Sequence, residues 1–584
     1  MRDFAPPILT DAPLRRPLKI FASDPMLGRK TGNRVVIEIE NDVDCGRPRN
    51  SRLEVIDYDG AHKRFYKPVN LDEPSILMQQ GLEPSEGDPR FHQQMVFAVA
   101  MKTLENFDRA LGRRLELRKP LRIFPHAFHG ANAFYSREQH ALLFGYFRAD
   151  TTNPGPNLPG QTVFTCLSHD IVVHETTHAL VDRLREHFME PTNHDVLAFH
   201  EGFSDIVALF QHFTFADILK DEIQRTRTDL SKPTLLAELA QQFGFASGSG
   251  KALRSALETK DPKHYQTVFE PHARGAILVG AVFDAFFETY QRRIRDLVRI
   301  ATGGSGNLPD GDLHPDLVNR IATEAAKTAQ IILTMCIRAF EYLPPVDVTF
   351  GDYLRALVTA DYELFPEDTF GQRSALIECF RQRGIYPDEV RSLAEESLLW
   401  ESPTGLRVPM ESFAGELASA AMGFNRERKT VVTRDGAIKL HAFAKAHSKQ
   451  LRLDPDRDIA VNGFHVNFRV GPEGKLVVEI VAQFIQTDES YRERLGGIPL
   501  RGGTTIVIAG DGAIRYVIAK PIVRRSDTAE DRDVPEGKAR LARQTAYMLE
   551  LDERDPHMAF CDDKYRGKRM KARMSLQALH GGRP

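Results

Sequence analysis

The feature that most constrains this chain is the segment IVVHETTHALVDRL at residues 171–184. Apolar residues recur at helical spacing on both sides of two histidines, which predicts a helix. Four residues along a helix correspond to about 400° of rotation, so His174 and His178 project from one face, one turn apart. Two imidazoles at this separation can bind one zinc ion, and Glu175 would lie beside that ion as a general base for an activated water molecule.

The same residues could belong to an ordinary amphipathic helix, because a motif of five residues with two free positions arises by chance in many long chains. The flanks favour the metal site. The apolar run Ile171, Val172 and Val173 precedes the motif and Ala179 and Leu180 follow it, so we expect a buried helix. Two histidines and a glutamate on a buried helix are costly unless they are paired or bind a metal.

A third protein ligand is expected in AFHEGFSDIVALF (198–210), where apolar residues again recur at helical spacing. A catalytic zinc site has three protein ligands and an open fourth position. Glu201, which we place at the start of this helix, is the candidate ligand. Asp205 follows one turn later on the same face, where it could accept the N–H of a ligating histidine and fix its tautomer. The alternative is that both carboxylates lie on a solvated helix face.

Composition limits the class of protein and its partners. A chain of 584 residues is too long for one core and predicts two to four domains. A formal net charge of −3 gives no reason to expect a nucleic-acid partner. Because the sequence has no long apolar run, we also expect no membrane partner. The five cysteines are scattered and the N-terminus lacks a secretory pattern. We therefore expect a reducing compartment, the cytoplasm.

Strand and helix signals divide the chain into three parts and predict an α+β fold. Residues 1–88 are β-rich, residues 89–388 form a larger unit that becomes mostly helical after residue 163, and residues 389–584 mix helices with strands. The clearest segments are a helix at 91–111 ending at Gly112, a hairpin at 132–147, and a hairpin about Gly510–Gly512 within 504–522, with single strands at 34–40, 121–128 and 475–485.

Several segments, in the same order, resemble the thermolysin-like metallopeptidases of the gluzincin class, over roughly residues 90–388. HDIVVHETTHALVD (169–182) resembles the active-site helix of that family, and HEGFSDI (200–206) resembles its second ligand helix. ANAFY (131–135) resembles the edge strand that holds the substrate, and EPHARGAILVGAVFDAF (270–286) resembles the segment with the histidine that stabilises the tetrahedral intermediate. The resemblance implies a thermolysin-like fold with a β-rich N-lobe and a mostly helical C-lobe, next to an N-terminal β-rich segment and a C-terminal α+β domain.

The resemblance also implies roles for individual residues. His174, His178 and Glu201 would bind one zinc ion, and Glu175 would be the general base. Asp205 would orient a ligand by accepting the N–H of a ligating histidine. His272 would stabilise the oxyanion, and Asn132 with Ala133 would hold the substrate peptide along the edge strand.

The chain departs from the family pattern at several positions. The segment 185–200 contains no Tyr to donate to the oxyanion, and His194 is the first candidate for that vacancy. His200 stands where the family often has Asn. Thr267 stands in place of the Asp that orients the stabilising histidine, and Glu270 is the candidate substitute. The acidic loops that bind calcium in secreted members are not visible, so we expect zinc and no calcium.

The leading interpretation is a zinc-dependent endopeptidase or oligopeptidase that acts on peptides or unfolded protein. A gluzincin aminopeptidase is the second interpretation, although the Gly-x-Met-Glu-Asn strand of that group is missing. The third is an inactive peptidase fold that binds peptides or acts as a scaffold; Glu175 argues against it, because binding needs no general base. The loop 244–253 lacks the residues of a phosphate-binding loop, and we interpret the basic segment 564–574 as a solvated terminus.

Overall fold

A computed structural model of the chain describes residues 13–22, 25, 33–43, 46–152, 157–230, 260–308, 310–413, 434–471, 474–524, 533–554 and 580. The loop 244–253 and the basic segment 564–574 lie outside these residues. Within them, the chain forms helices together with antiparallel and mixed sheets, which confirms the α+β fold class. No helix in the described ranges is both long enough and apolar enough to cross a membrane.

The N-terminal part of the chain builds a mixed sheet with β7 at one edge. The strand order is β3-β6-β8-β7; β3 and β8 run parallel to β6, β7 runs antiparallel to β8, and β9 also pairs with β8. Among the described strands β7 pairs only with β8, so its other edge faces away from the sheet. The strands of this part are β1 (Arg15–Phe21), β2 (Arg34–Glu40), β3 (Leu53–Val55), β4 (Tyr58–Asp59), β5 (Arg64–Phe65), β6 (Leu121–His129), β7 (Ala133–Ser136), β8 (Ala141–Arg148) and β9 (Thr162–Phe164).

The predicted hairpin and helix of this part are both present. β7 and β8 pair with Ala133 opposite Phe144. The helix α2 (Pro89–Leu111) follows a short α1 (Pro74–Met78); Asp88 caps α2 by accepting from the backbone N–H of Arg90, and Gly112 ends it with a φ of 68°. This left-handed conformation favours glycine, because a residue with a Cβ is strained there.

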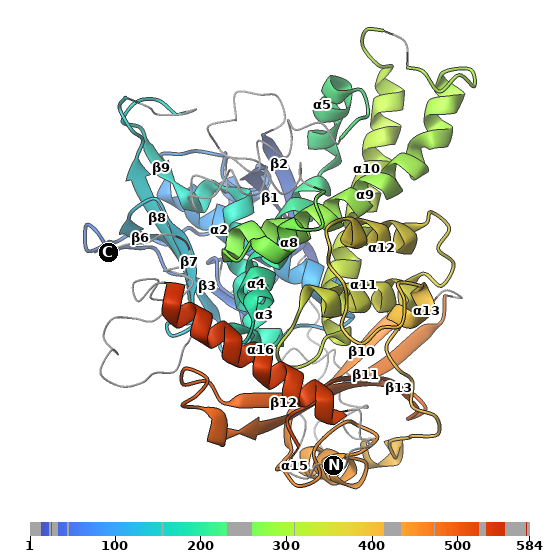
Figure 1. Ribbon diagram of the computed structural model, residues 1–584. Helices are drawn as coiled ribbons and strands as arrows, with labels where there is room; N and C mark the ends of the chain where they lie inside the picture. The colour runs from blue at the N-terminus through green and yellow to red at the C-terminus, as the bar shows by residue number, and fades with distance from the viewer. Residues whose placement is uncertain are drawn as a thin grey trace, which may run out of the picture.

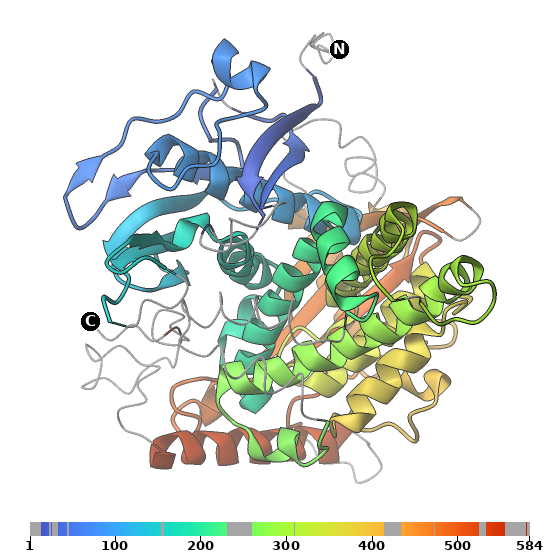
Figure 2. The same cartoon turned by 90° about the horizontal axis from the view of Figure 1, so that it is seen from above.

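Helices form the centre of the molecule. In Figure 1, α3 and α4 lie between the cyan strands of the mixed sheet and the green helices α9 and α10, and Figure 2 shows the same arrangement from above. The helices of this part are η2 (Thr165–Leu167), α3 (His169–Leu184), η3 (Glu186–Met189), α4 (His194–Phe213), α5 (Ala216–Thr226), α8 (His264–Thr267), α9 (Pro271–Ala301), α10 (Pro315–Arg338), η4 (Ala339–Tyr342), α11 (Phe350–Leu364), α12 (Gln372–Gln382) and α13 (Glu395–Leu398).

The C-terminal part forms a four-stranded antiparallel sheet in the order β10-β11-β12-β13. The predicted hairpin at 504–522 is present as β12 and β13, and the predicted strand at 475–485 overlaps β11, which begins at Leu476. The helix α16 (red in Figure 1) runs alongside this sheet. The elements are η5 (Met410–Phe413), α15 (Arg434–Ala446), β10 (Ala460–Val470), β11 (Leu476–Asp488), η6 (Glu489–Tyr491), β12 (Leu500–Ala509), β13 (Ile514–Lys520) and α16 (Asp533–Arg554).

This C-terminal sheet is buried on both faces. Successive side chains of a strand point to opposite faces. Val481 and Val507 therefore join the large apolar core around α3, α4 and α9, whereas their neighbours Ile480 and Ile506 join a second core with α15. The C-terminal sheet thus shares a core with the helices at the centre of the molecule. Residues 1–88 are joined to the following residues in a similar way, because β3 pairs with β6 in the mixed sheet.

Candidate metal centre

The helices α3 and α4 bring three predicted ligands together. Nε2 of His174 and Nε2 of His178 are 3.0 Å apart. They lie 3.4 Å from Oε2 and 3.6 Å from Oε1 of Glu201, respectively. Atoms that bind one zinc ion tetrahedrally at 2.0–2.1 Å lie about 3.3–3.4 Å from one another. The donor atoms are thus spaced as ligands of a single ion would be, and with His580 they form a buried group that could hold one.

The charges of this group favour a cation at its centre. Burial alone would lower the pKa of His174, but hydrogen bonds with Asp205 and Glu201 raise it to about 10. Burial holds the pKa of His178 well below its ordinary value. Burial would also raise the pKa of Glu201, but the surrounding histidines outweigh it and lower that pKa. The cluster therefore gathers positive charge around the carboxylate of Glu201, and a metal ion bound there would supply positive charge at the same place.

Each of the two candidate ligand histidines on α3 has a partner at its other ring nitrogen. Nδ1 of His174 is 2.8 Å from Oδ1 of Asp205. Nδ1 of His178 is 2.9 Å from Nδ1 of His200 and 3.2 Å from Oγ of Ser204. These contacts orient both rings so that Nε2 points to Glu201. His200, which we noted only as a replacement for Asn, is thus the partner of a candidate ligand.

The helix that carries Glu201 begins earlier than we predicted. We placed Glu201 at the helix start, whereas α4 begins at His194, where Asn193 accepts from the backbone N–H of Asp195 at 2.7 Å. Glu201 therefore lies about two turns inside the helix. The prediction was wrong because almost every residue from 195 to 204 is buried, so the first turns of α4 show no amphipathic pattern.

A close crossing of α4 and α9 places His272 beside Glu201. A Cβ added at Gly202 would lie 2.7 Å from the carbonyl oxygen of Gly275, and a Cβ added at Gly275 would lie 2.8 Å from that of Ala198. Only a residue without a side chain permits this approach at each position. Near this crossing, Nε2 of His272 is 3.4 Å from Oε2 of Glu201.

His272 is oriented by Glu270, the residue we considered as a substitute for the missing Asp. Nδ1 of His272 is 2.9 Å from Oε1 of Glu270, and Glu270 also accepts from the backbone N–H groups of His272 and Ala273 at the start of α9. Burial would raise the pKa of Glu270, but its contacts with His272 lower it. Among the described residues, no group forms a hydrogen bond with the buried Nε2 of His272, whose contact with Glu201 is an ion pair at 3.4 Å. His194, by contrast, forms an ion pair with Glu550 of α16 at 2.9 Å and is not part of this group.

Glu175 connects the centre to the free edge of β7. Its Oε2 accepts from the backbone N–H of Tyr135 at 2.8 Å. On the same edge, the carbonyl oxygen of Ala133 accepts from Nδ1 of His580 at 2.9 Å. Asn132 lies next to it, with its Oδ1 accepting from the backbone N–H of Ala133 at 2.8 Å. The predicted base and the predicted substrate-holding residues thus lie at one place.

His580 completes the group, and we did not predict it. Its Nε2 is 3.4 Å from Oε2 of Glu201, its Nδ1 is 3.3 Å from Oε1 of Glu175, and its side chain is 4% exposed. A single histidine 379 positions away from Glu201 belongs to no helical or strand pattern around the motif. No local signal in the sequence could have connected it to the centre.

Two further buried groups have the composition of metal ligands. In one, Oδ1 of Asp170 lies 2.9 Å from Nδ1 of His169 and 3.2 Å from Nδ1 of His212. Burial would raise the pKa of Asp170, but the two rings lower it to about 2, so this carboxylate is satisfied without a cation. The other group consists of His92, His126 and Cys166, and there two ring nitrogens face each other.

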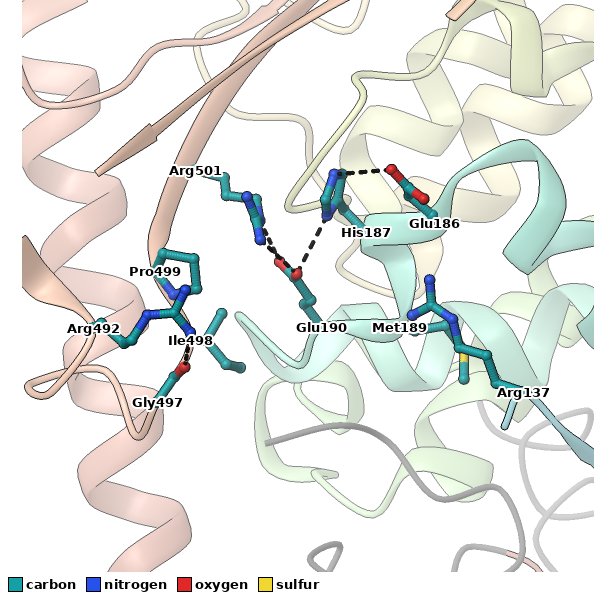
Figure 3. Close-up of a pocket in the computed structure, with 10 residues that line it drawn as sticks. All are labelled: Arg137, Glu186, His187, Met189, Glu190, Arg492, Gly497, Ile498, Pro499 and Arg501. Atoms are coloured by element: carbon teal, nitrogen blue, oxygen red, sulfur yellow. Dashed lines mark hydrogen bonds and ion pairs between the residues drawn. The ribbon is translucent and has the colours of Figure 1, made fainter. Parts of the chain in front are cut away.

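A pocket opens beyond β7, between η3 and the segment that leads into β12 (Figure 3). Arg137, directly after β7, lies on one side, and Arg492 and Arg501 lie on the other. Glu190 joins the two sides, because it pairs with Arg501 at 2.8 Å and with His187 at 3.3 Å. The C-terminal part therefore supplies one wall of a pocket at the end of the edge strand.

Comparison with known proteins adds no assignment to this geometry. Models of known protein families do not match the chain, and no curated protein matches it either.

Proposed function

We propose that this protein is a zinc-dependent peptidase with a thermolysin-like arrangement of its site, acting on peptides or unfolded protein as an endopeptidase or oligopeptidase. The observation that carries the proposal is the convergence of His174, His178 and Glu201 at distances of 3.0–3.6 Å, beside Glu175. Two imidazoles and one carboxylate are a donor set that suits catalytic zinc. The nitrogen and oxygen donor atoms of these residues suit zinc, whereas calcium needs a set of oxygen ligands.

The residues around the centre have separate roles in the proposed hydrolysis of a peptide bond. Zinc, when bound, supplies the Lewis acidity that activates water and polarises the scissile carbonyl. Glu175 accepts the proton of the attacking water and returns it to the leaving amine. His272 donates from Nε2 to the developing oxyanion, while Glu270 holds its Nδ1. Asp205 and His200 keep the two ligand rings in place.

The free edge of β7 is the proposed binding site for the substrate backbone. An extended peptide can add to such an edge through main-chain hydrogen bonds. Ala133 and Tyr135 direct their backbone groups toward Glu175 and His580, which is where a scissile bond would need to lie. Main-chain recognition along an edge favours an endopeptidase or oligopeptidase over an aminopeptidase, which must capture a substrate amine.

We further infer a reducing compartment, the cytoplasm, as the place of action. Cys166, Cys336 and Cys379 are buried and free. Secreted proteins with several cysteines usually pair them. Fractionation of cells that express the native protein tests this inference.

The central experiment compares Glu175→Gln with the wild-type chain and with Glu138→Gln, a control outside the centre. Zinc content is measured by mass spectrometry and peptidase activity with quenched casein. Glu175→Gln should retain zinc and lose nearly all turnover, because the amide cannot accept the proton. A wild-type protein that binds zinc but cleaves no peptide would favour the inactive, peptide-binding alternative. A wild-type protein without zinc affinity would overturn the proposal.

A further inference from the structure

We propose that His580 is a fourth ligand of the metal centre and that it closes the centre in the resting protein. This inference rests on the proposed function, because it concerns the regulation of the same site. Catalytic zinc sites keep one position open for water or substrate, whereas structural sites are filled by four protein ligands. His174, His178, Glu201 and His580 together are a complete set of four, all of them buried.

The hydrogen bonds of His580 determine which of its nitrogens faces the metal. Nδ1 lies 2.9 Å from the carbonyl oxygen of Ala133 and 3.3 Å from Oε1 of Glu175. Both partners are acceptors, so Nδ1 carries the proton. The lone pair is then on Nε2, which lies 3.4 Å from Oε2 of Glu201, about the separation of two ligands of one zinc ion.

The same contacts place His580 in the position of a substrate. It uses the carbonyl of Ala133 on the free edge of β7, and it contacts the general base Glu175. A peptide on that edge and the ring of His580 therefore compete for the same groups. Activity requires that His580 leave the centre, and the wild-type chain is therefore expected to show reduced but measurable activity, because a substrate must displace the ring.

The test uses the full-length chain, His580→Ala, and His447→Ala as a control that removes a histidine from the end of α15. X-ray absorption of the zinc protein should report fewer imidazole ligands per zinc ion in His580→Ala than in the wild type and in His447→Ala. Acetohydroxamate, a small ligand for an open zinc position, should bind His580→Ala about tenfold more tightly if the open state of the wild type is populated about a tenth of the time. Turnover of quenched casein should rise by a similar factor.

The outcomes separate this inference from the proposed function. An equal number of imidazole ligands per zinc ion in the wild type and in His580→Ala, or equal hydroxamate affinity in all three chains, overturns the role of His580 and leaves the peptidase proposal intact. A wild-type chain that binds no zinc overturns both.

A different observation points to a second metal site. We infer that His92, His126 and Cys166 bind a divalent ion of the zinc type. Nε2 of His92 lies 3.0 Å from the carbonyl oxygen of Glu86, and Nδ1 of His126 lies 2.6 Å from Oδ1 of Asp57. Both partners accept hydrogen bonds, so both of these outer nitrogens carry protons.

The inner nitrogens then face each other as two lone pairs. Nδ1 of His92 and Nε2 of His126 are only 2.8 Å apart, so this contact needs either a proton shared between the two rings or a metal ion near both nitrogens. The sulfur of Cys166 and one ring nitrogen of each of the two histidines lie within 4.8 Å of one another. Two imidazoles and a thiolate are preferred zinc ligands, and the outer contacts to Glu86 and Asp57 are the partners that ligating histidines usually have.

The charges of this site balance with a divalent ion. One thiolate leaves one positive charge on the metal group, and the nearby carboxylate of Asp57 offsets it. The group of His169, Asp170 and His212 differs, because there a carboxylate lies between two ring nitrogens and is satisfied by hydrogen bonds alone. The site is built by α2, β6 and η2, away from the residues assigned to catalysis, and we infer that it stabilises the mixed sheet.

Cobalt substitution tests this second site without any measurement of activity. Within the part of the chain that the structure describes, Cys166 is the cysteine grouped with other metal ligands, and the candidate catalytic centre offers nitrogen and oxygen ligands alone, so a cobalt–thiolate charge-transfer band would report this site. We expect the band in the wild type and in Cys336→Ala, a control with another buried free cysteine, and its loss in Cys166→Ala and His126→Gln. Zinc content should be two ions per chain in the wild type and one in Cys166→Ala. A wild-type chain without the band, or a band unchanged in Cys166→Ala, overturns the site.

Discussion

Oδ1 of Asp205 lies 2.8 Å from Nδ1 of His174, one helical turn after the carboxylate of Glu201 on α4. One short segment therefore supplies both a candidate ligand and the group that orients another ligand. The side chain of Asp205 is 16% exposed, so its negative charge acts on His174 with little screening by solvent. The arrangement holds a proton of His174 on Nδ1 and directs Nε2 toward His178 and Glu201.

Replacing Asp205 should weaken the binding of zinc without removing any ligand. Loss of such an outer partner typically costs about 10- to 100-fold in metal affinity, and we expect Asp205→Ala to fall in that range. Asp205→Asn should lose less, because its amide oxygen still accepts from Nδ1. Chelator competition gives the dissociation constants, with Asp221→Ala on the exposed side of α5 as the control. Equal affinity in Asp205→Ala and the control would contradict the orienting role.

His272 and Glu270 should act as one unit. Loss of one oxyanion donor costs about 10²–10³-fold in turnover, so His272→Ala should retain zinc and remain a weak enzyme. Glu270→Gln should lower kcat by a smaller factor with little effect on KM, because Glu270 acts by orienting His272. The double variant should be no slower than His272→Ala, since the two residues share one function.

Steady-state kinetics with a quenched peptide measure these values, and zinc content is checked for each variant. Glu270 also caps α9, so a thermal unfolding curve is needed to separate the loss of the cap from the loss of the ring contact. Additive losses in the double variant would show that Glu270 acts independently of His272.

The parts of the centre that could be predicted are those in which neighbours in sequence become neighbours in space. A helix places residues four apart on one face, and this spacing was enough to identify His174 with His178 and Glu201 with Asp205. Glu270 could be proposed as the residue that orients His272, because it lies only two positions before His272 in the sequence. The hairpin of β7 and β8 followed from a strand pattern within one short segment.

The remaining features depend on tertiary contacts that have no local pattern. The crossing at Gly202 and Gly275 brings two helices together across a gap in the sequence, and a glycine alone does not reveal its partner. His580 and the group of His92, His126 and Cys166 combine residues from separate elements. The burial of α4 on all sides likewise concealed its true start at His194.

The C-terminal sheet should be essential for the stability of the whole chain. Glu479 on β11 is 1% exposed and forms ion pairs with Arg338, at the end of α10, and with Arg469 on β10. Removing one partner of a buried pair costs about 3–5 kcal/mol, because the other charge remains buried. We expect this loss in the free energy of unfolding of Glu479→Ala.

Urea unfolding followed by circular dichroism measures the loss for Glu479→Ala. The matched control is Glu489→Ala, whose pair with Arg492 is exposed and should contribute at most about 1 kcal/mol. If the two variants unfold at the same urea concentration, the buried pair does not join the sheet to the helices energetically.

The attachment of α16 to the rest of the fold should weaken in acid, because it depends on the negative charge of Asp347. This side chain is 5% exposed, and it lies 2.8 Å from Arg540 and 3.1 Å from Arg543, both on α16. Burial would raise the pKa of Asp347, but the two guanidinium groups outweigh it and hold the pKa well below its ordinary value. A carboxyl group with a lowered pKa in the folded state stabilises the fold above its unfolded pKa, near 4, and this contribution is lost as the pH falls below that value.

Asp347→Asn should therefore lower the free energy of unfolding at pH 7 by about 3 kcal/mol, because Arg540 is left buried without its counter-charge. The difference between this variant and the wild type should shrink as the pH falls from about 4 toward 2. Asp388→Asn is the control, since its carboxylate also pairs with Arg543 but is 64% exposed. Its replacement should change the free energy of unfolding by at most about 1 kcal/mol. Urea unfolding across this pH range decides the matter: a difference between Asp347→Asn and the wild type that stays constant down to pH 2 would mean that Asp347 does not hold α16 through its charge.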